Sequence, residues 1–87
     1  MPNREEIILY TTFGCHLCEQ VEAMIFALNE KKNLTKTHEV IAFDIIDDEK
    51  ILEEYRTTIP VLKNRTTNEK LFWPFTFEEL EKWFYRS

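Results

Sequence analysis

The chain has 87 residues, of which 44% are hydrophobic, and a formal net charge of −5 at pH 7. This length and hydrophobic content predict one small folded domain over residues 1–87 and argue against a disordered chain. The acidic balance argues against a nucleic-acid partner, because phosphate binding needs a basic face. No apolar run approaches the roughly 20 residues that span a bilayer, so we expect no membrane partner either.

The first predicted unit is a strand, a turn and a helix. Residues 7–11 form a short apolar run typical of a buried strand, and residues 12–14 form a turn that contains the only glycine. Helical spacing of apolar residues then runs from Cys15 to about Asn29. The apolar residues of this stretch are Leu17, Cys18, Val21, Met24, Ile25 and Leu28, with Glu19, Glu22 and Glu30 on the other side.

A second strand is predicted over residues 38–45, after a polar connection over residues 29–37. Its apolar residues are Val40, Ile41, Phe43 and Ile45. Two strands that flank one helix form a βαβ unit, whose connection is right-handed and whose strands are parallel.

A short helix is predicted over residues 48–55, with Asp47 or Asp48 as its N-cap. A third strand over residues 59–62 follows, and Pro60 lies at its start. The strand is expected to form a hairpin with the next one along the chain.

The chain is predicted to close with a polar loop over residues 64–69, a fourth strand over residues 70–73 and a helix over residues 77–85. Thr76 and Glu79 have the spacing of a capping box at the start of that helix. The order β-α-β-α-β-β-α predicts an α/β fold, with a four-stranded mixed sheet and helices on both faces.

Cys15 and Cys18 are the only cysteines, and they stand where the first strand gives way to the first helix. At a helix N-terminus, unpaired N–H groups and the helix dipole favour a thiolate. A second thiol three residues further on is close enough to close a disulfide. The pattern is typical of a thiol–disulfide redox site.

The polar, acidic start of the chain differs from a signal peptide, so we expect a cytoplasmic protein. In a reducing compartment a cysteine pair has a catalytic or metal-binding role more often than a structural one.

Two motifs resemble those of a known family. The run from Leu9 to Cys18, LYTTFGCHLC, resembles the strand–turn–C-x-x-C–helix opening of glutaredoxins. The run Arg56-Thr57-Thr58-Ile59-Pro60 is similar to the arginine–threonine–valine–proline run before their third strand. The element order also matches the glutaredoxin-like branch of the thioredoxin fold over nearly the whole chain. The resemblance implies a thioredoxin-like fold and a small dithiol oxidoreductase that reduces protein disulfides or glutathione mixed disulfides.

The chain departs from the glutaredoxin pattern where glutathione is usually held. His16 and Leu17 replace the usual proline and aromatic residue, and Thr12 replaces a common lysine. Trp73-Pro74-Phe75 stands where a glycine pair usually follows the fourth strand. We therefore expect no tightly bound cofactor and no metal, and we keep glutathione only as a candidate co-substrate.

The two cysteines are expected to have different roles. Cys15, in the first helical turn and partly exposed, is the predicted nucleophile; the alternative is an inert core cysteine. Cys18, on the apolar side of the helix, is the predicted resolving thiol; the alternative is a small core residue. His16 either stabilises the thiolate or points to water, and Leu17 belongs to an apolar rim around the site.

The second motif supplies further candidate binding residues. Pro60 resembles the cis-proline of the thioredoxin fold, and Ile59 before it would offer its backbone to an extended substrate segment. Arg56 and Thr58 would bind a glutathione carboxylate or a peptide, or Arg56 is a solvated charge. We expect Trp73 and Phe75 to pack in the core rather than to line a groove.

Two other functions stay open. Cys15 and Cys18 would supply two thiolates to a metal or iron–sulfur carrier, although structural zinc needs four ligands and no second pair is present. The domain would otherwise be a redox-inert interaction module. For the oxidoreductase we expect a monomer whose partners are disulfide-containing proteins, glutathione, or both.

Overall fold

The structure is a computed structural model that describes residues 4–85, so residues 1–3 and 86–87 of the predicted domain lie outside the described part. The elements are β1 (Glu5–Thr11), α1 (His16–Lys32), β2 (His38–Asp44), α2 (Glu49–Tyr55), β3 (Val61–Asn64), β4 (Lys70–Phe72) and α3 (Phe77–Tyr85). Single turns of 3-10 helix stand at Leu34–Lys36 and Ile45–Asp47. The predicted order of strands and helices is confirmed.

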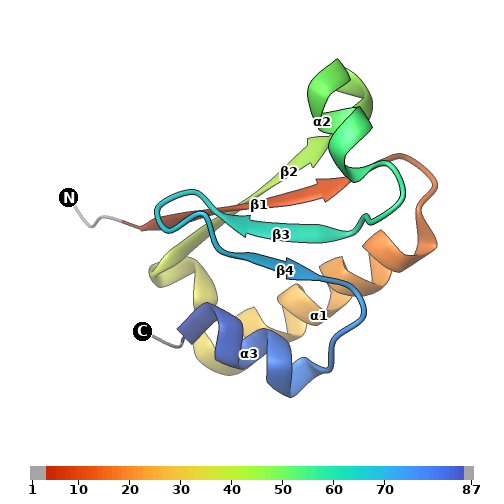
Figure 1. Ribbon diagram of the computed structural model, residues 1–87. Coiled ribbons are helices and arrows are strands. Elements are labelled where there is room, and N and C mark those ends of the chain that lie inside the picture. The colour runs from red at the N-terminus through yellow and green to blue at the C-terminus, as the bar shows by residue number, and fades with distance from the viewer. Residues whose placement is uncertain (1–3, 86–87) are drawn as a thin grey trace.

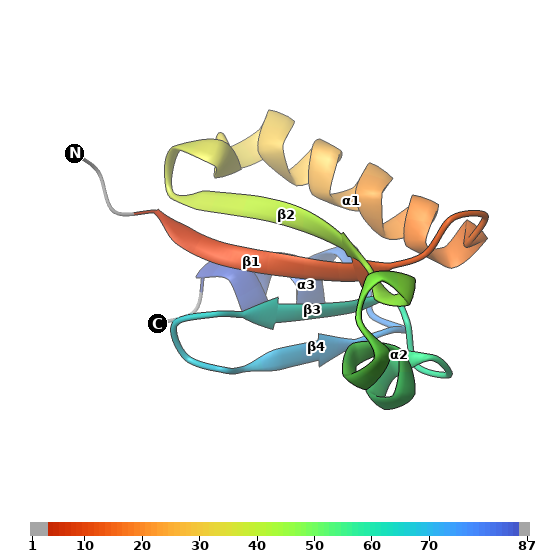
Figure 2. The same ribbon diagram turned by 90° about the horizontal axis from the view of Figure 1, so that it is seen from above.

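The four strands form one mixed sheet in the order β2-β1-β3-β4 (Figures 1 and 2). β1 is parallel to β2 and antiparallel to β3, and β3 is antiparallel to β4. The β1–α1–β2 unit and the β3–β4 hairpin therefore meet at β1. The C-terminal end of β1 therefore lies between β2 from the first half of the chain and β3 from the second half.

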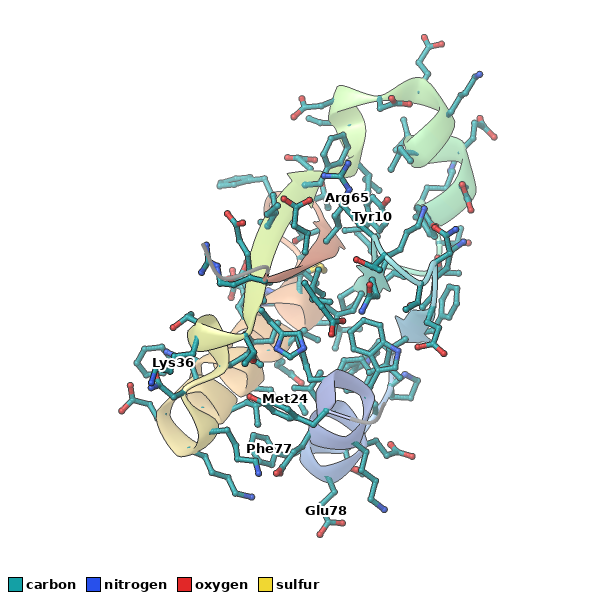
Figure 3. The ribbon with its side chains drawn as sticks, turned by 90° about the vertical axis from the view of Figure 1, so that its left-hand side faces the viewer. Tyr10, Met24, Lys36, Arg65, Phe77 and Glu78 are labelled. Carbon is teal, nitrogen blue, oxygen red and sulfur yellow. A yellow bond between two sulfur atoms is a disulfide. The ribbon has the colours of Figure 1, made fainter. Side chains whose placement is uncertain are left out.

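Helices cover both faces of the sheet, as the sequence predicts. Ile7 and Leu9 of β1 belong to the main core with α1 and α3, whereas Tyr10 belongs to a second cluster with α2. This split follows from the alternation of side chains along a strand. Figure 3 shows Met24 of α1 and Phe77 of α3 between the two helices, where both pack against the main core.

Local capping signals in the sequence are confirmed. The Asp48 carboxylate accepts hydrogen bonds from the backbone N–H groups of Lys50 and Ile51 at the start of α2. Thr76 and Glu79 form the reciprocal pair of a capping box before α3. None of the helices within residues 4–85 has the length and apolar character needed to cross a membrane.

Both ends of α1 differ from the prediction. The helix begins at His16 rather than Cys15, because Cys15 has an extended backbone (φ −84°, ψ 108°) and is the N-cap. It continues to Lys32, beyond the predicted end near Asn29. Asn33 ends it in the left-handed conformation (φ 58°), and the Asn33 N–H donates to the Asn29 carbonyl.

The third strand is shifted by two residues from the prediction of 59–62. It begins at Val61 because Pro60 has no N–H and the Ile59 N–H donates to the Tyr55 carbonyl. Asn64, predicted to open the loop, is the last residue of β3. The second and fourth predicted strands are each one residue too long, since β2 ends at Asp44 and β4 ends at Phe72.

Candidate active site

The turn between β1 and α1 brings the cysteine pair to the end of the sheet. Gly14 has φ +80°, a conformation that side-chain-bearing residues rarely adopt. The Cys15 N–H donates to the Thr12 carbonyl at 3.3 Å, which closes the turn. The chain then enters α1 with Cys15 at the boundary between turn and helix.

Cys15 and Cys18 form a disulfide, with their Cα atoms 5.2 Å apart. Cys15 is half-buried, whereas Cys18 is 1% exposed and lies among the core residues. The predicted difference in exposure between the two sulfur-bearing residues is confirmed. An incoming group can therefore reach the pair through Cys15.

The Cys15 sulfur occupies the position of an N-cap acceptor. The backbone N–H of Cys18 donates to Cys15 Sγ at 3.1 Å, and the Glu19 N–H donates to the Cys15 carbonyl at 3.1 Å. A donor to sulfur and the positive end of the helix dipole both favour the thiolate over the thiol. The arrangement therefore suits Cys15 for nucleophilic attack once the disulfide is reduced.

Exposed apolar side chains stand beside the pair. Phe13 is 97% exposed and Leu17 is 41% exposed, so Leu17 has the position of a rim residue. The sequence analysis did not predict Phe13 as a site residue, because it lies in the predicted turn over residues 12–14. His16 is exposed, and within residues 4–85 no hydrogen bond joins its ring to Cys15. This placement favours the alternative in which the imidazole points to water.

Pro60 lies at the same end of the sheet as the cysteine pair. Val61 pairs with Tyr10 of β1. Pro60, which precedes Val61, therefore lies beside Thr11, the last residue of β1. Figure 1 and Figure 2 show the β1–α1 turn and the α2–β3 loop at this common end. The Ile59–Pro60 peptide bond is cis, as expected from the resemblance.

Only one of the two backbone groups of Ile59 is available to pair with a substrate segment. Its N–H donates to the Tyr55 carbonyl at 3.1 Å, so the N–H is already engaged within the protein. The Ile59 carbonyl is the group that remains for pairing with an extended segment.

The other predicted binding residues lie on the same loop but away from the pocket at the disulfide. Arg56 is exposed, and its Nη1 lies 3.9 Å from a carboxylate oxygen of Glu53. Thr58 is exposed, and its hydroxyl donates to the Tyr55 carbonyl at 3.3 Å. Neither residue lines the pocket beside the cysteines.

The segment after β4 packs rather than lining a groove at the disulfide. Phe75 is buried in the main core, and Trp73 packs against that core with its ring centroid 5.2 Å from that of Phe75. The packing interpretation is confirmed for Trp73 and Phe75, while Pro74 and Phe75 also line a separate pocket of about 280 Å³ beside α3. The Trp73–Pro74 peptide bond is also cis, which the sequence did not indicate.

A pocket of about 280 Å³ opens beside the disulfide. Its walls are formed by Thr11, Thr12, Phe13, Gly14, Cys15, Cys18, Glu19, Glu22 and Asp44. The sequence did not single out the three acidic residues. Two sequence signals could have identified them. Glu19 and Glu22 each follow a cysteine by four residues, and Asp44 stands near the end of the predicted second strand, which is parallel to the first.

Within residues 4–85 no three or more histidine, cysteine, aspartate and glutamate side chains are grouped so that they would hold a metal ion.

A C-x-x-C disulfide at the start of α1 and a cis-proline before β3 make this a glutaredoxin-like protein of the thioredoxin fold. The chain belongs to the family described as Glutaredoxin-like domain (DUF836), which matches residues 6–85.

Two solved structures are similar to the chain. Northeast Structural Genomics target protein XcR50 from X. campestris is 26% identical, with a TM-score of 0.71, over 88% of this chain and 92% of that one. Protein Ne2328 from Nitrosomonas europaea, at 21% identity, shares the fold with a TM-score of 0.73 over 95% of this chain and 94% of that one. No curated protein matches the sequence.

Proposed function

We propose that the protein is a small dithiol oxidoreductase that reduces disulfides, with Cys15 as the nucleophile and Cys18 as the resolving thiol. The observation that supports this most directly is the asymmetry of the pair. The half-buried Cys15 sulfur accepts a backbone hydrogen bond at the start of α1, while Cys18 is 1% exposed. A solvent-accessible thiolate and a shielded second thiol are what a two-step exchange requires.

The reaction starts from the reduced pair. The Cys15 thiolate attacks one sulfur of the substrate disulfide, so that a mixed disulfide forms and the other substrate sulfur leaves as a thiolate that takes a proton from water. The Cys18 thiol then loses its proton to water and attacks Cys15 Sγ, which releases the second substrate sulfur as a thiolate that also takes a proton from water. The substrate gains two electrons and two protons, and Cys15 and Cys18 become a disulfide.

A thiol reductant must return the pair to the dithiol form. We propose glutathione or a dithiol reductase for this step, with protein disulfides or glutathione mixed disulfides as the substrates. The exposed Phe13 and Leu17 beside Cys15 favour a protein segment as the substrate. In this proposal the protein acts as a monomer in the cytoplasm, without a tightly bound cofactor.

Redox titration of the Cys15–Cys18 pair tests the proposal. The protein is equilibrated in buffers of graded thiol–disulfide potential, and the fraction of free thiols is measured by alkylation and mass spectrometry. We expect one reversible two-electron transition that is absent in Cys15→Ser. Turnover with glutathione-based and dithiol-reductase-based electron supplies, run in parallel, then identifies the reductant.

The alternatives predict different results. A pair that does not change reversibly between disulfide and dithiol contradicts the oxidoreductase and supports a redox-inert interaction module. Reduced protein that is purified with a coloured cluster on its thiolates supports the carrier instead.

A further inference from the structure

The pocket beside the disulfide is lined by acidic side chains that have no role in the thiol–disulfide exchange described above. Both cysteines are part of its wall, so a group inside it lies next to the reacting sulfurs. Three carboxylates, from Glu19, Glu22 and Asp44, share that wall. The residues that line the pocket include no lysine and no arginine.

The fold itself gathers these acids at the sulfurs. Cys15 is the N-cap of α1, Cys18 and Glu19 lie in the first turn of that helix, and Glu22 lies about one turn beyond Cys18. Asp44 arrives from the neighbouring strand, because it pairs with Thr11 at the last position of the parallel β1–β2 register. The pocket therefore lies on the β2 side of β1, and Pro60 lies on the β3 side.

These carboxylates are not neutralised within the protein. Five other acids have cationic partners: Glu6 pairs with Arg65, Glu39 with Arg4, Glu53 with Arg56, Glu54 with Lys70, and Glu81 with Lys31 and Lys32. In the part of the chain that the structure describes, no ion pair involves Glu19, Glu22 or Asp44. Asp44 uses one oxygen to accept from the Ile46 N–H. The pocket therefore holds negative charge that an incoming group would meet.

We propose that this pocket receives a lysine or arginine side chain of the substrate protein, close in sequence to the substrate cysteine that bonds to Cys15. The proposal rests on the proposed oxidoreductase function and names its substrate class. A cation in the pocket interacts favourably with the carboxylates, whereas a substrate with an acidic neighbour, such as the anionic tripeptide glutathione, is repelled. The preference decreases with salt, since the pocket is open to solvent.

The test uses three peptides that differ only at the residue next to a single cysteine, which is lysine, glutamine or glutamate. Each cysteine is supplied as a mixed disulfide with thiopyridine, and the release of thiopyridone by the reduced protein is followed by absorbance. Each rate is divided by the rate of the same peptide with 2-mercaptoethanol, which removes the peptide's intrinsic reactivity.

We expect the normalised rates to fall in the order lysine, glutamine, glutamate. One charge pair at contact distance in water changes the rate by on the order of fivefold. The order should flatten at ~1 M salt, where the Debye length is about 3 Å.

The variants Glu19→Gln, Glu22→Gln and Asp44→Asn remove the charges while keeping the side-chain shape. The amide introduced by Asp44→Asn retains an oxygen that can accept from the Ile46 N–H. The triple variant should lose the lysine preference. Glu30→Gln is the matched control, because Glu30 is an exposed acid of the same helix that does not line the pocket. It should keep the wild-type order and rates.

Equal normalised rates for the three peptides, or an unchanged lysine preference in the triple variant, would overturn the proposal. In both cases thiopyridone is still released, so the oxidoreductase function stands. If no peptide exchanges with the reduced pair, the oxidoreductase function fails, and cation recognition fails with it.

Discussion

The backbone N–H of Cys18 donates a hydrogen bond to the sulfur of Cys15 over 3.1 Å. The donor belongs to the main chain, and the acceptor occupies the place where helices usually carry the oxygen of a serine, threonine or aspartate. The same pair of residues is therefore linked twice, by a disulfide and by a capping hydrogen bond. The capping bond does not depend on the Cys18 side chain, so the two links can be separated by mutation.

The first prediction concerns the acidity of Cys15. In Cys18→Ser the backbone donor is retained and the only thiol is Cys15. We expect its pKa to lie below the ordinary value of about 8.5, because the N–H and the helix dipole stabilise the thiolate against the opposing charge of the pocket carboxylates Glu19, Glu22 and Asp44. The measurement is the rate of iodoacetamide alkylation as a function of pH. The same variant unfolded in guanidinium chloride supplies the reference, and a folded midpoint at or above that reference contradicts the capping argument.

The second prediction separates the roles of the two thiols. Cys18→Ser should form the mixed disulfide with substrate but fail to resolve it, because the shielded second nucleophile is missing. Non-reducing electrophoresis and intact mass should show a protein–substrate adduct that accumulates. Cys15→Ser is the matched control and should give no adduct with the same substrate. Turnover of Cys18→Ser at the wild-type rate would point instead to a mechanism with one cysteine.

The third prediction concerns the turn before the pair. A Cβ at Gly14 would meet no atom within 4 Å, so Gly14→Ala creates no clash and is strained only by φ +80°. We expect a loss of roughly 1–2 kcal/mol in the free energy of unfolding for Gly14→Ala, and a smaller loss for Gly14→Asn. Urea unfolding of the oxidised protein measures both. Gln20→Ala, at an exposed position of α1, is the control, and equal stability of Gly14→Ala and wild type would rule out the backbone explanation.

Features encoded by neighbouring residues were predictable from the sequence. The bounds of α3 agree with the prediction because Thr76 and Glu79 form a capping box that is visible as a local motif. The asymmetry of Cys15 and Cys18 follows in the same way from helical periodicity, which turns one sulfur toward the core. Short-range patterns of this kind are independent of the rest of the fold.

Features that depend on the backbone conformation of a turn or on the sheet register were missed or displaced. The start of β3 is displaced because the Ile59 N–H is engaged by the Tyr55 carbonyl, a turn contact that residue preferences do not reveal. Asp44 was overlooked as a site residue because only the β1–β2 register brings it opposite Thr11. The end of α1 was placed too early because apolar periodicity stops at Leu28, whereas the stop signal is the left-handed Asn33.

The fourth prediction is a loss of stability at alkaline pH. Burial raises the pKa of Tyr10 above 10.0, and the neighbouring Tyr55 and Glu54 raise it further. As pH rises above 10, the unfolded chain therefore loses the Tyr10 proton before the folded protein does, and the free energy of unfolding decreases. Tyr10→Phe retains the ring that stacks on Tyr55 at 4.5 Å and removes the proton.

Urea unfolding at pH 7 and at pH 10.5 measures this effect. We expect wild type to lose more stability than Tyr10→Phe between the two values. Part of the loss is shared by both proteins. Hydrogen bonds to Tyr55 and Glu54 raise the pKa of Lys70, so the stability that protonated Lys70 contributes is also lost as pH rises. Identical losses in wild type and variant would show that Tyr10 does not carry the effect.

The fifth prediction concerns a buried histidine to which the sequence assigned no role. The Nδ1 atom of His38 lies 2.7 Å from the Thr37 hydroxyl, and Nε2 donates to the Phe84 carbonyl at 3.0 Å. The imidazole therefore ties β2 to the last turn of α3. In His38→Phe the Phe84 carbonyl loses this donor inside the core, which should cost about 1–3 kcal/mol in the free energy of unfolding.

Thr37→Val is the matched control for His38→Phe, because it removes the hydroxyl and leaves the bond to Phe84 intact. Its loss should be the smaller of the two in urea unfolding. His38 pairs with Glu5 at the opposite end of the β1–β2 register from Thr11, about 20 Å along the strand from the turn that carries Cys15. The redox midpoint of His38→Phe should therefore equal that of wild type. A shifted midpoint, or a smaller loss than in Thr37→Val, would contradict a purely structural role for His38.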